Sequence, residues 1–138
     1  MKRDKHDKCM SFLVRERAEW RCERCNKYFP EGHRGGLKCS HYYGRARKST
    51  RWFPDNLTSL CTGCHFYFGG ARDEYTSFLR KELGEVLFDD LVLRGNKPRK
   101  YTKSDMAEMY THYKAQLAYM EKRRMKGERG WIDFVQWD

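Results

Sequence analysis

The chain has 138 residues and carries 29 Lys and Arg against 19 Asp and Glu, a formal net charge of +10. No run approaches the ~18 apolar residues that a membrane-spanning helix requires, and the charged start leads into no signal-peptide core, so we expect no membrane association and a soluble, cytoplasmic protein. A charge surplus of this size favours a polyanionic partner, nucleic acid first of all, although it could also serve solubility alone.

The length predicts one domain with a small core, of the kind that a bound metal or disulfides often brace. The first predicted element is a helix over 7–18 with Asp7 as its cap. Glycines and prolines within 22–50 then predict a hairpin with irregular loops and β-compatible pieces such as 37–43. Apolar residues at steps of three and four predict a short helix over 56–68, which ends at the following glycine pair.

The second half of the chain predicts helices. Its apolar stripe over 75–91 fits either two helices or one helix bent at Gly84. After a break around a proline, Thr102 and Asp105 form a capping-box pattern in front of a long amphipathic helix. The aromatic end of the chain, 131–137, is expected to pack back onto the body.

Four of the six cysteines form two Cys-x-x-Cys pairs, Cys22 with Cys25 and Cys61 with Cys64. Each pair offers two thiolates from one tight turn, which together make the ligand set of a tetrahedral structural zinc ion, Zn²⁺. The ion would join the start of the hairpin to the helix after it. The alternatives are disulfides, which need an oxidising compartment, and redox pairs, which usually stand in a βαβ context. Of the remaining two cysteines, Cys39 is either a small buried residue or a substitute ligand.

The loop between the two cysteine pairs holds Ser40, His41 and Asn56, and His65 directly follows the last cysteine. The chain resembles the ββα-metal motif of the His-Asn-His (HNH) endonucleases in two segments, CSHYYGR at 39–45 and DNLTSLCTGCH at 55–65. The basic residues around these segments and the helical tail make it most similar to the NinG recombination proteins of bacteriophages, over about 15–125.

The resemblance implies a fold as well as a site. The expected fold class is α+β, in one domain over 1–138. A ββα-metal nuclease core over 15–70 would be stapled by the four-cysteine zinc site and wrapped by the N-terminal helix. A helical extension over 71–138 would follow it.

The expected chemistry is hydrolysis of a phosphodiester bond. An imidazole with a pKa near neutrality can take a proton from water, and His41 is the candidate general base. A carbonyl or amide partner across the hairpin would hold its ring in one tautomer, and the resemblance gives this orienting role to Asn56. The resemblance also implies that His65 binds one catalytic divalent ion, Mg²⁺ or Mn²⁺, which stabilises the pentacovalent phosphate. Arg45 would stand beside the scissile phosphate.

Ser40 departs from the usual pattern of the family, in which Asp or His before the general base is the second metal ligand. A hydroxyl is a poor ligand, so the ion would be held by His65 with waters, by the region of Cys39, or by a carboxylate from elsewhere. The nearest such donors are Asp73 and Glu74. Glu74 could instead be a helix-start carboxylate that interacts with the helix dipole.

Four cations follow the candidate base within one loop, where they would neutralise DNA phosphates. They are Arg45, Arg47, Lys48 and Arg51. The alternative is a solvated loop with no partner. The neighbouring Trp52 and Phe53 could stack on bases, but the pair is more typical of a core anchor.

The sequence therefore predicts a divalent-metal-dependent HNH DNA endonuclease that is structure-specific for branched recombination intermediates, encoded by a phage and active in the bacterial cytoplasm. Two alternatives stay open: a non-catalytic zinc-containing nucleic-acid-binding module, and a nicking or homing nuclease that reads duplex sequence. Symmetric junction cleavage would require a homodimer, and the Met- and Tyr-rich face of the long last helix could supply the interface. The same face could equally be monomer core.

Overall fold

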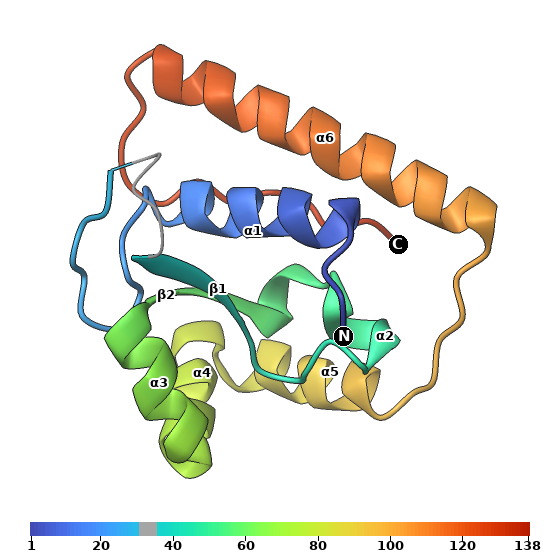
Figure 1. Cartoon of the computed structure of the whole chain (residues 1–138), viewed down its shortest axis with the longest axis horizontal. Coiled ribbons are helices and arrows are strands. Elements are labelled where there is room, and N and C mark those ends of the chain that lie inside the picture. Colours follow the sequence, from blue (N-terminus) through green and yellow to red (C-terminus); the bar gives the residue numbers. More distant parts are fainter. Residues whose placement is uncertain (31–35) are drawn as a thin grey trace.

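A computed structural model describes residues 1–30 and 36–138. These residues form six α-helices, one 3-10 helix and a two-stranded sheet, so the chain is α+β as predicted. Helix α6 (Lys103–Met125) lies alongside α1 (Lys5–Arg17), the sheet lies on the other side of α1, and α4 (Arg72–Leu83) and α5 (Glu85–Gly95) lie beyond the sheet (Figure 1). Within the described ranges, no helix combines the length and apolarity needed to cross a membrane.

The sheet consists of β1 (Leu37–His41) and β2 (Leu57–Cys61), which pair antiparallel with His41 opposite Leu57. Two short helices, α2 (Lys48–Arg51) and η1 (Pro54–Asn56), lie in the connection, and α3 (Thr62–Gly70) follows β2 directly.

Strand β2 corrects the prediction of a helix over 56–68, because only the second half of that segment is helical. Four of the five residues of β2 are buried, so both faces of the strand are covered. A strand covered on both faces shows no alternation of apolar and polar residues. The spacing of Leu57 and Leu60 then imitates a helical turn.

The helix ends follow local signals. Helix α1 begins before the predicted start, because Asp4 is its N-cap and Asp7, at the third position, completes a capping box. Thr102 and Asp105 form the predicted capping box of α6. Gly84, with φ of +82°, separates α4 from α5, so the two-helix alternative is confirmed.

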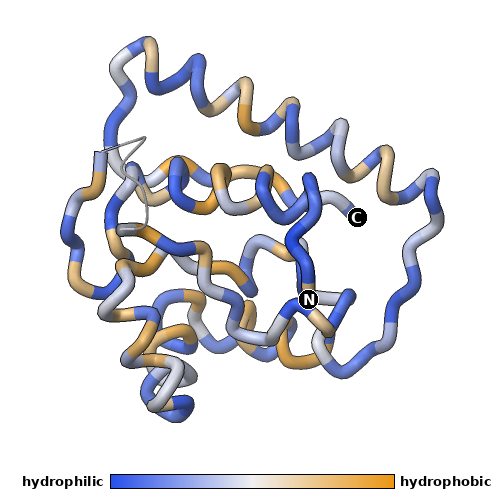
Figure 2. The backbone as a smooth tube through the Cα atoms, viewed as in Figure 1, coloured by the Kyte–Doolittle hydropathy of each residue, from blue (hydrophilic) through white to orange (hydrophobic). Residues whose placement is uncertain are grey.

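The residues that the structure describes form two apolar cores. The first core joins the sheet to α3, α4 and α5. The second core joins α1 to α6 and to the C-terminal tail, where buried Ile132 and Phe134 confirm that the chain end packs back. In Figure 2 apolar residues concentrate along the middle of the molecule, and hydrophilic residues dominate the connection between α5 and α6.

The Met- and Tyr-rich face of α6 belongs to the second core. Met109, Tyr113 and Met120 are buried there. Trp52 and Phe53 are buried as well, so their expected role as core anchors is confirmed. A homodimer would therefore need a different surface from this face of α6.

Candidate metal centre and active-site cleft

The four paired cysteines come together at one point. Cys22 and Cys25 lie in the segment after α1, whereas Cys61 ends β2 and Cys64 lies in the first turn of α3. Their sulfur atoms all lie within 4.8 Å of one another, and the Sγ atoms of Cys25 and Cys61 are 3.8 Å apart. This separation suits two ligands of one ion and is far longer than the ~2.05 Å of a disulfide bond.

The backbone around the cysteines favours thiolate ligands. Asn26 adopts φ of +65°, a left-handed conformation that Asn tolerates, and its N–H donates to the Cys22 carbonyl oxygen at 2.8 Å. The turn lets the Cys25 N–H approach the Cys22 Sγ at 3.5 Å. In the second pair, the Cys64 N–H approaches the Cys61 Sγ at 3.4 Å. Such N–H groups stabilise negative charge on sulfur.

The four cysteines could therefore hold a metal ion, in a ligand set compatible with structural zinc. Burial raises the pKa of Cys64 to about 12, and the hydrogen bond from the Arg24 guanidinium, 3.4 Å from its Sγ, opposes that rise. A bound cation would favour the thiolate further. Because four protein ligands complete a tetrahedron, no position would remain for substrate, and the site is suited to holding β2 and α3 to the chain after α1.

A cleft of about 460 Å³ is lined by residues of α1, β1 and α3. His41, the last residue of β1, lines this cleft together with His65 from the first turn of α3. Arg45, from the loop after β1, lines it as well. The structure thus brings three of the predicted catalytic residues to one place.

The ring of His41 has one nitrogen engaged. Its Nε2 lies 3.2 Å from the carbonyl oxygen of Arg51, which favours the tautomer with the proton on Nε2. In the described part of the chain, Nδ1 makes no hydrogen bond. Burial lowers the pKa of His41, and the charge of Asp7 opposes this effect only in part. The imidazole is therefore neutral at pH 7, the form that can accept a proton.

Asn56 acts on the loop and not on the imidazole itself. It is fully buried, with its Oδ1 accepting the Tyr43 N–H at 2.8 Å. Its Nδ2 donates to the carbonyl oxygens of Tyr43, at 2.9 Å, and Thr50, at 3.0 Å. Asn56 therefore closes the loop between the strands, and the carbonyl next to that of Thr50 is the one that His41 contacts.

Of the residues expected as further ligands of the catalytic ion, Ser40 and Glu74 do not line the cleft. Successive side chains of a strand point to opposite faces, so Ser40 points away from the face of β1 that carries His41. The Ser40 hydroxyl is buried and accepts a hydrogen bond from the Tyr75 hydroxyl on α4 at 2.9 Å. Glu74 is exposed on α4, outside the cleft. Cys39 does line the cleft, and burial raises the pKa of its thiol to about 12.

The four cations predicted to bind nucleic acid fall into two groups. Arg45 lines the cleft, and Lys48 is exposed on α2. Arg47 donates to a carbonyl oxygen of α5 at 2.7 Å. Arg51 is only 7% exposed because its guanidinium forms an ion pair with Asp7 at 2.6 Å. These last two arginines hold the loop against α5 and α1.

Sequence reasoning missed several cleft residues. Arg3, Asp7 and Arg15 come from the N-terminal part of the chain, and Lys38 comes from β1. Lys38 lies in the predicted hairpin close to the candidate base, so its place in the chain could have indicated it. The other three line the cleft only because α1 docks against the sheet, which no local pattern reveals.

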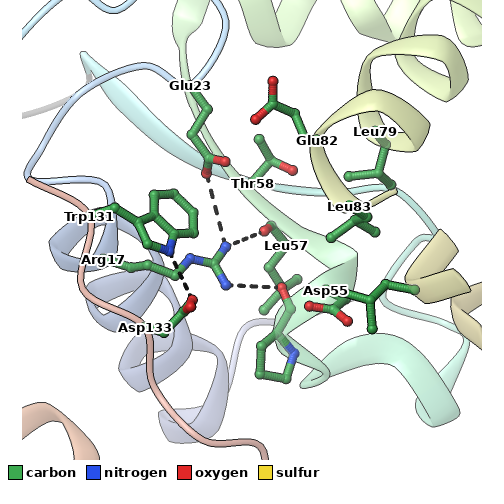
Figure 3. A pocket seen from close by; sticks show the side chains of 12 residues that line it. Arg17, Glu23, Asp55, Leu57, Thr58, Leu79, Glu82, Leu83, Trp131 and Asp133 are labelled. Atoms are coloured by element: carbon green, nitrogen blue, oxygen red, sulfur yellow. Dashed lines mark hydrogen bonds and ion pairs between the residues drawn. The ribbon is translucent and has the colours of Figure 1, made fainter. Parts of the chain in front are cut away.

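A second cavity, of about 290 Å³, lies beside Arg17 (Figure 3). Arg17 donates to the carbonyl oxygens of Pro54, at 3.3 Å, and Leu57, at 2.6 Å, and so holds the chain on both sides of Asn56. The carboxylates that line this cavity are Glu23, Asp55, Glu82 and Asp133. Such an acidic lining disfavours a phosphate ligand in this cavity.

Comparison with protein-family models, with curated proteins and with solved structures finds no match to this chain.

Proposed function

We propose that this chain is a divalent-cation-dependent DNA endonuclease of the HNH type, with His41 as its general base. The observation that carries the proposal is the meeting of His41, His65 and Arg45 in one cleft. They stand on an antiparallel strand pair followed directly by a helix, which is the element order that the ββα-metal resemblance implies. The basic cleft and the net charge of +10 support a polyanionic substrate.

His41 would take the proton of the attacking water at Nδ1, because Nε2 is held by the Arg51 carbonyl. Arg45 would bind an oxygen of the scissile phosphate and stabilise charge in the transition state. Asn56 would keep the loop that carries the Arg51 carbonyl in place. The three residues would thus respectively accept a proton, neutralise charge and support the orientation of the base.

The divalent ion that the resemblance implies, Mg²⁺ or Mn²⁺, would bind in the cleft beside His65, although an imidazole nitrogen is not the oxygen donor that Mg²⁺ prefers. Among the described residues, the four cysteines are the one group of three or more close metal ligands, so the cleft holds no such group. His65 would therefore be the main protein ligand of an ion bound in the cleft. Water and phosphate oxygens would complete the shell, which is how Mg²⁺ is often bound. The bound ion would supply positive charge at the phosphate and the leaving oxygen.

Branched recombination intermediates are the proposed substrates, on the basis of the resemblance to the NinG proteins of bacteriophages. The test uses linear, flap and four-way-junction DNA of matched sequence with Mg²⁺ or Mn²⁺. We expect the intact chain to cut branched DNA and His41→Ala to bind it while cutting at least ~10²-fold more slowly. The matched control is His112→Gln, since His112 contacts the C-terminal tail and lies outside the cleft. Equal cutting of linear and branched DNA would instead favour a nuclease that reads duplex sequence.

A non-catalytic zinc-containing nucleic-acid-binding module is the second candidate. The orientation of Ser40 favours it, because the position of the usual second metal ligand faces Tyr75 and not the cleft. Binding of all three DNA forms by both proteins, with cleavage by neither in either ion, would establish this candidate and eliminate the nuclease.

A further inference from the structure

A buried ion pair joins the N-terminal helix to the candidate active site. Asp7 of α1 accepts two hydrogen bonds from Arg51 of α2, from Nε to Oδ1 at 3.0 Å and from Nη2 to Oδ2 at 2.6 Å. The two residues, Asp7 and Arg51, are 4% and 7% exposed. A two-pronged pair of this kind fixes the plane of the guanidinium as well as its distance.

The backbone of the same arginine contacts the candidate base. The carbonyl oxygen of Arg51 lies 3.2 Å from Nε2 of His41. The preceding carbonyl, that of Thr50, accepts a hydrogen bond from Asn56 Nδ2 at 3.0 Å. The four residues of α2 are too few for a stable helix of their own, so their position depends on such contacts.

We propose that Asp7 is a positioning residue, which acts through Arg51 to hold the ring of His41 in its working orientation. The inference rests on the proposed function, in which His41 is the base. The inference adds α1 to the elements that build the candidate active site, which are otherwise β1, β2 and α3. Asp7 also lines the cleft, but its two oxygens are occupied by Arg51 and by the Asp4 N–H, so it orients the base and does not bind the ion.

A second buried ion pair on α1 supplies a matched control. Glu16 accepts a hydrogen bond from Arg124 of α6 at 2.9 Å and is 6% exposed. It lies about two and a half turns along the helix from Asp7 and outside the cleft. Glu16→Gln therefore perturbs a comparable buried pair on the same helix without touching the support of His41.

The first experiment compares cleavage rates of Asp7→Asn, Arg51→Gln, the double variant and Glu16→Gln, each below its melting temperature. We expect the first two to lower kcat roughly tenfold to a hundredfold with little change in KM, because the base is misplaced while DNA contacts remain. The double variant should be no slower than the worse single one. Glu16→Gln should stay within about twofold of the intact chain. Equal losses in Asp7→Asn and Glu16→Gln would overturn the proposal.

The second experiment does not depend on activity. Nitrogen NMR of His41 reports which ring nitrogen carries the proton. We expect the Nε2-protonated form in the intact chain and in Glu16→Gln, and a mixture of tautomers in Asp7→Asn. An unchanged spectrum in Asp7→Asn would refute the positioning role even if the chain cleaves DNA. If the spectrum changes in Asp7→Asn but the intact chain cuts no DNA, the positioning role would stand and the nuclease proposal would fail.

Discussion

The two cores of this protein are held together in different ways. The first core contains short elements and loops, with the four cysteines at its edge and Leu60 fully buried in its middle. The second core contains α6, a helix of 23 residues, which packs along α1 and is tied to it by the pair of Glu16 and Arg124. The second core is built along one long helix, whereas the first core joins several shorter elements that a metal ion at the four cysteines could hold together.

Loss of a metal-binding cysteine should show the difference between the two cores most clearly. We expect Cys64→Ser, or a strong chelator, to remove one bound zinc ion and to destabilise the fold by roughly 5 kcal/mol or more, because ion binding is coupled to folding. Metal analysis and urea unfolding measure the two effects. The matched control is Cys9→Ser, a buried cysteine of the second core that should keep the ion bound. Full stability of Cys64→Ser would show that the first core needs no ion.

Truncation in the second core should have the next largest effect. Leu13 on α1 is fully buried there, so Leu13→Ala should cost about 2–5 kcal/mol in the free energy of unfolding. The zinc content should not change, because the four cysteines lie against the first core. Release of the ion by Leu13→Ala would show that the two cores unfold as one unit around it.

Low pH should weaken the ion pair between Asp7 of α1 and Arg51 of α2. This pair joins α1, in the second core, to the connection between the two strands. Burial opposes ionisation of Asp7, but the hydrogen bonds from Arg51 outweigh it and lower its pKa from 3.8 to about 2. A lowered carboxyl pKa stabilises the fold above the unfolded pKa, and this contribution of about 2 kcal/mol is lost as the pH falls from about 5, through the folded pKa of about 2, to about 1.

Urea unfolding of the intact chain and Asp7→Asn as a function of pH measures this contribution. Acid protonates the metal-binding thiols in both proteins, so the difference between them isolates Asp7. We expect that difference to be largest above about pH 5 and to become smallest below about pH 2. A difference that does not vary with pH would mean that the pair contributes through packing alone.

The smallest effect is expected at the surface of α4 and α5. Arg80 and Glu85 form an ion pair at 3.2 Å with side chains that are 47% and 66% exposed. Solvent screens such a pair, so Glu85→Gln should change stability by less than about 1 kcal/mol. Thermal unfolding at low and high salt checks this. A larger loss would mark the α4–α5 junction as a weak point of the first core.

Local patterns in the sequence were sufficient for several features. The two Cys-x-x-Cys pairs predicted a shared site because each pair places both sulfurs within one turn. The capping box at Thr102 marked the start of α6, and Gly84 indicated either a helix end or a bend, since both signals act through neighbouring backbone groups. The HNH-like spacing also led to His41 and His65, which do share a cleft.

Tertiary structure alone decided the environment of that cleft. The segment 57–61 is a strand because β1 lies beside it, although its apolar spacing favoured a helix. Arg51 is paired with Asp7, a residue 44 positions away, and so is not available to DNA. Ser40 faces Tyr75 because of the way α4 packs on the sheet. Such long-range partners depend on how helices dock, and docking is a property of the whole packed core that short sequence patterns do not encode.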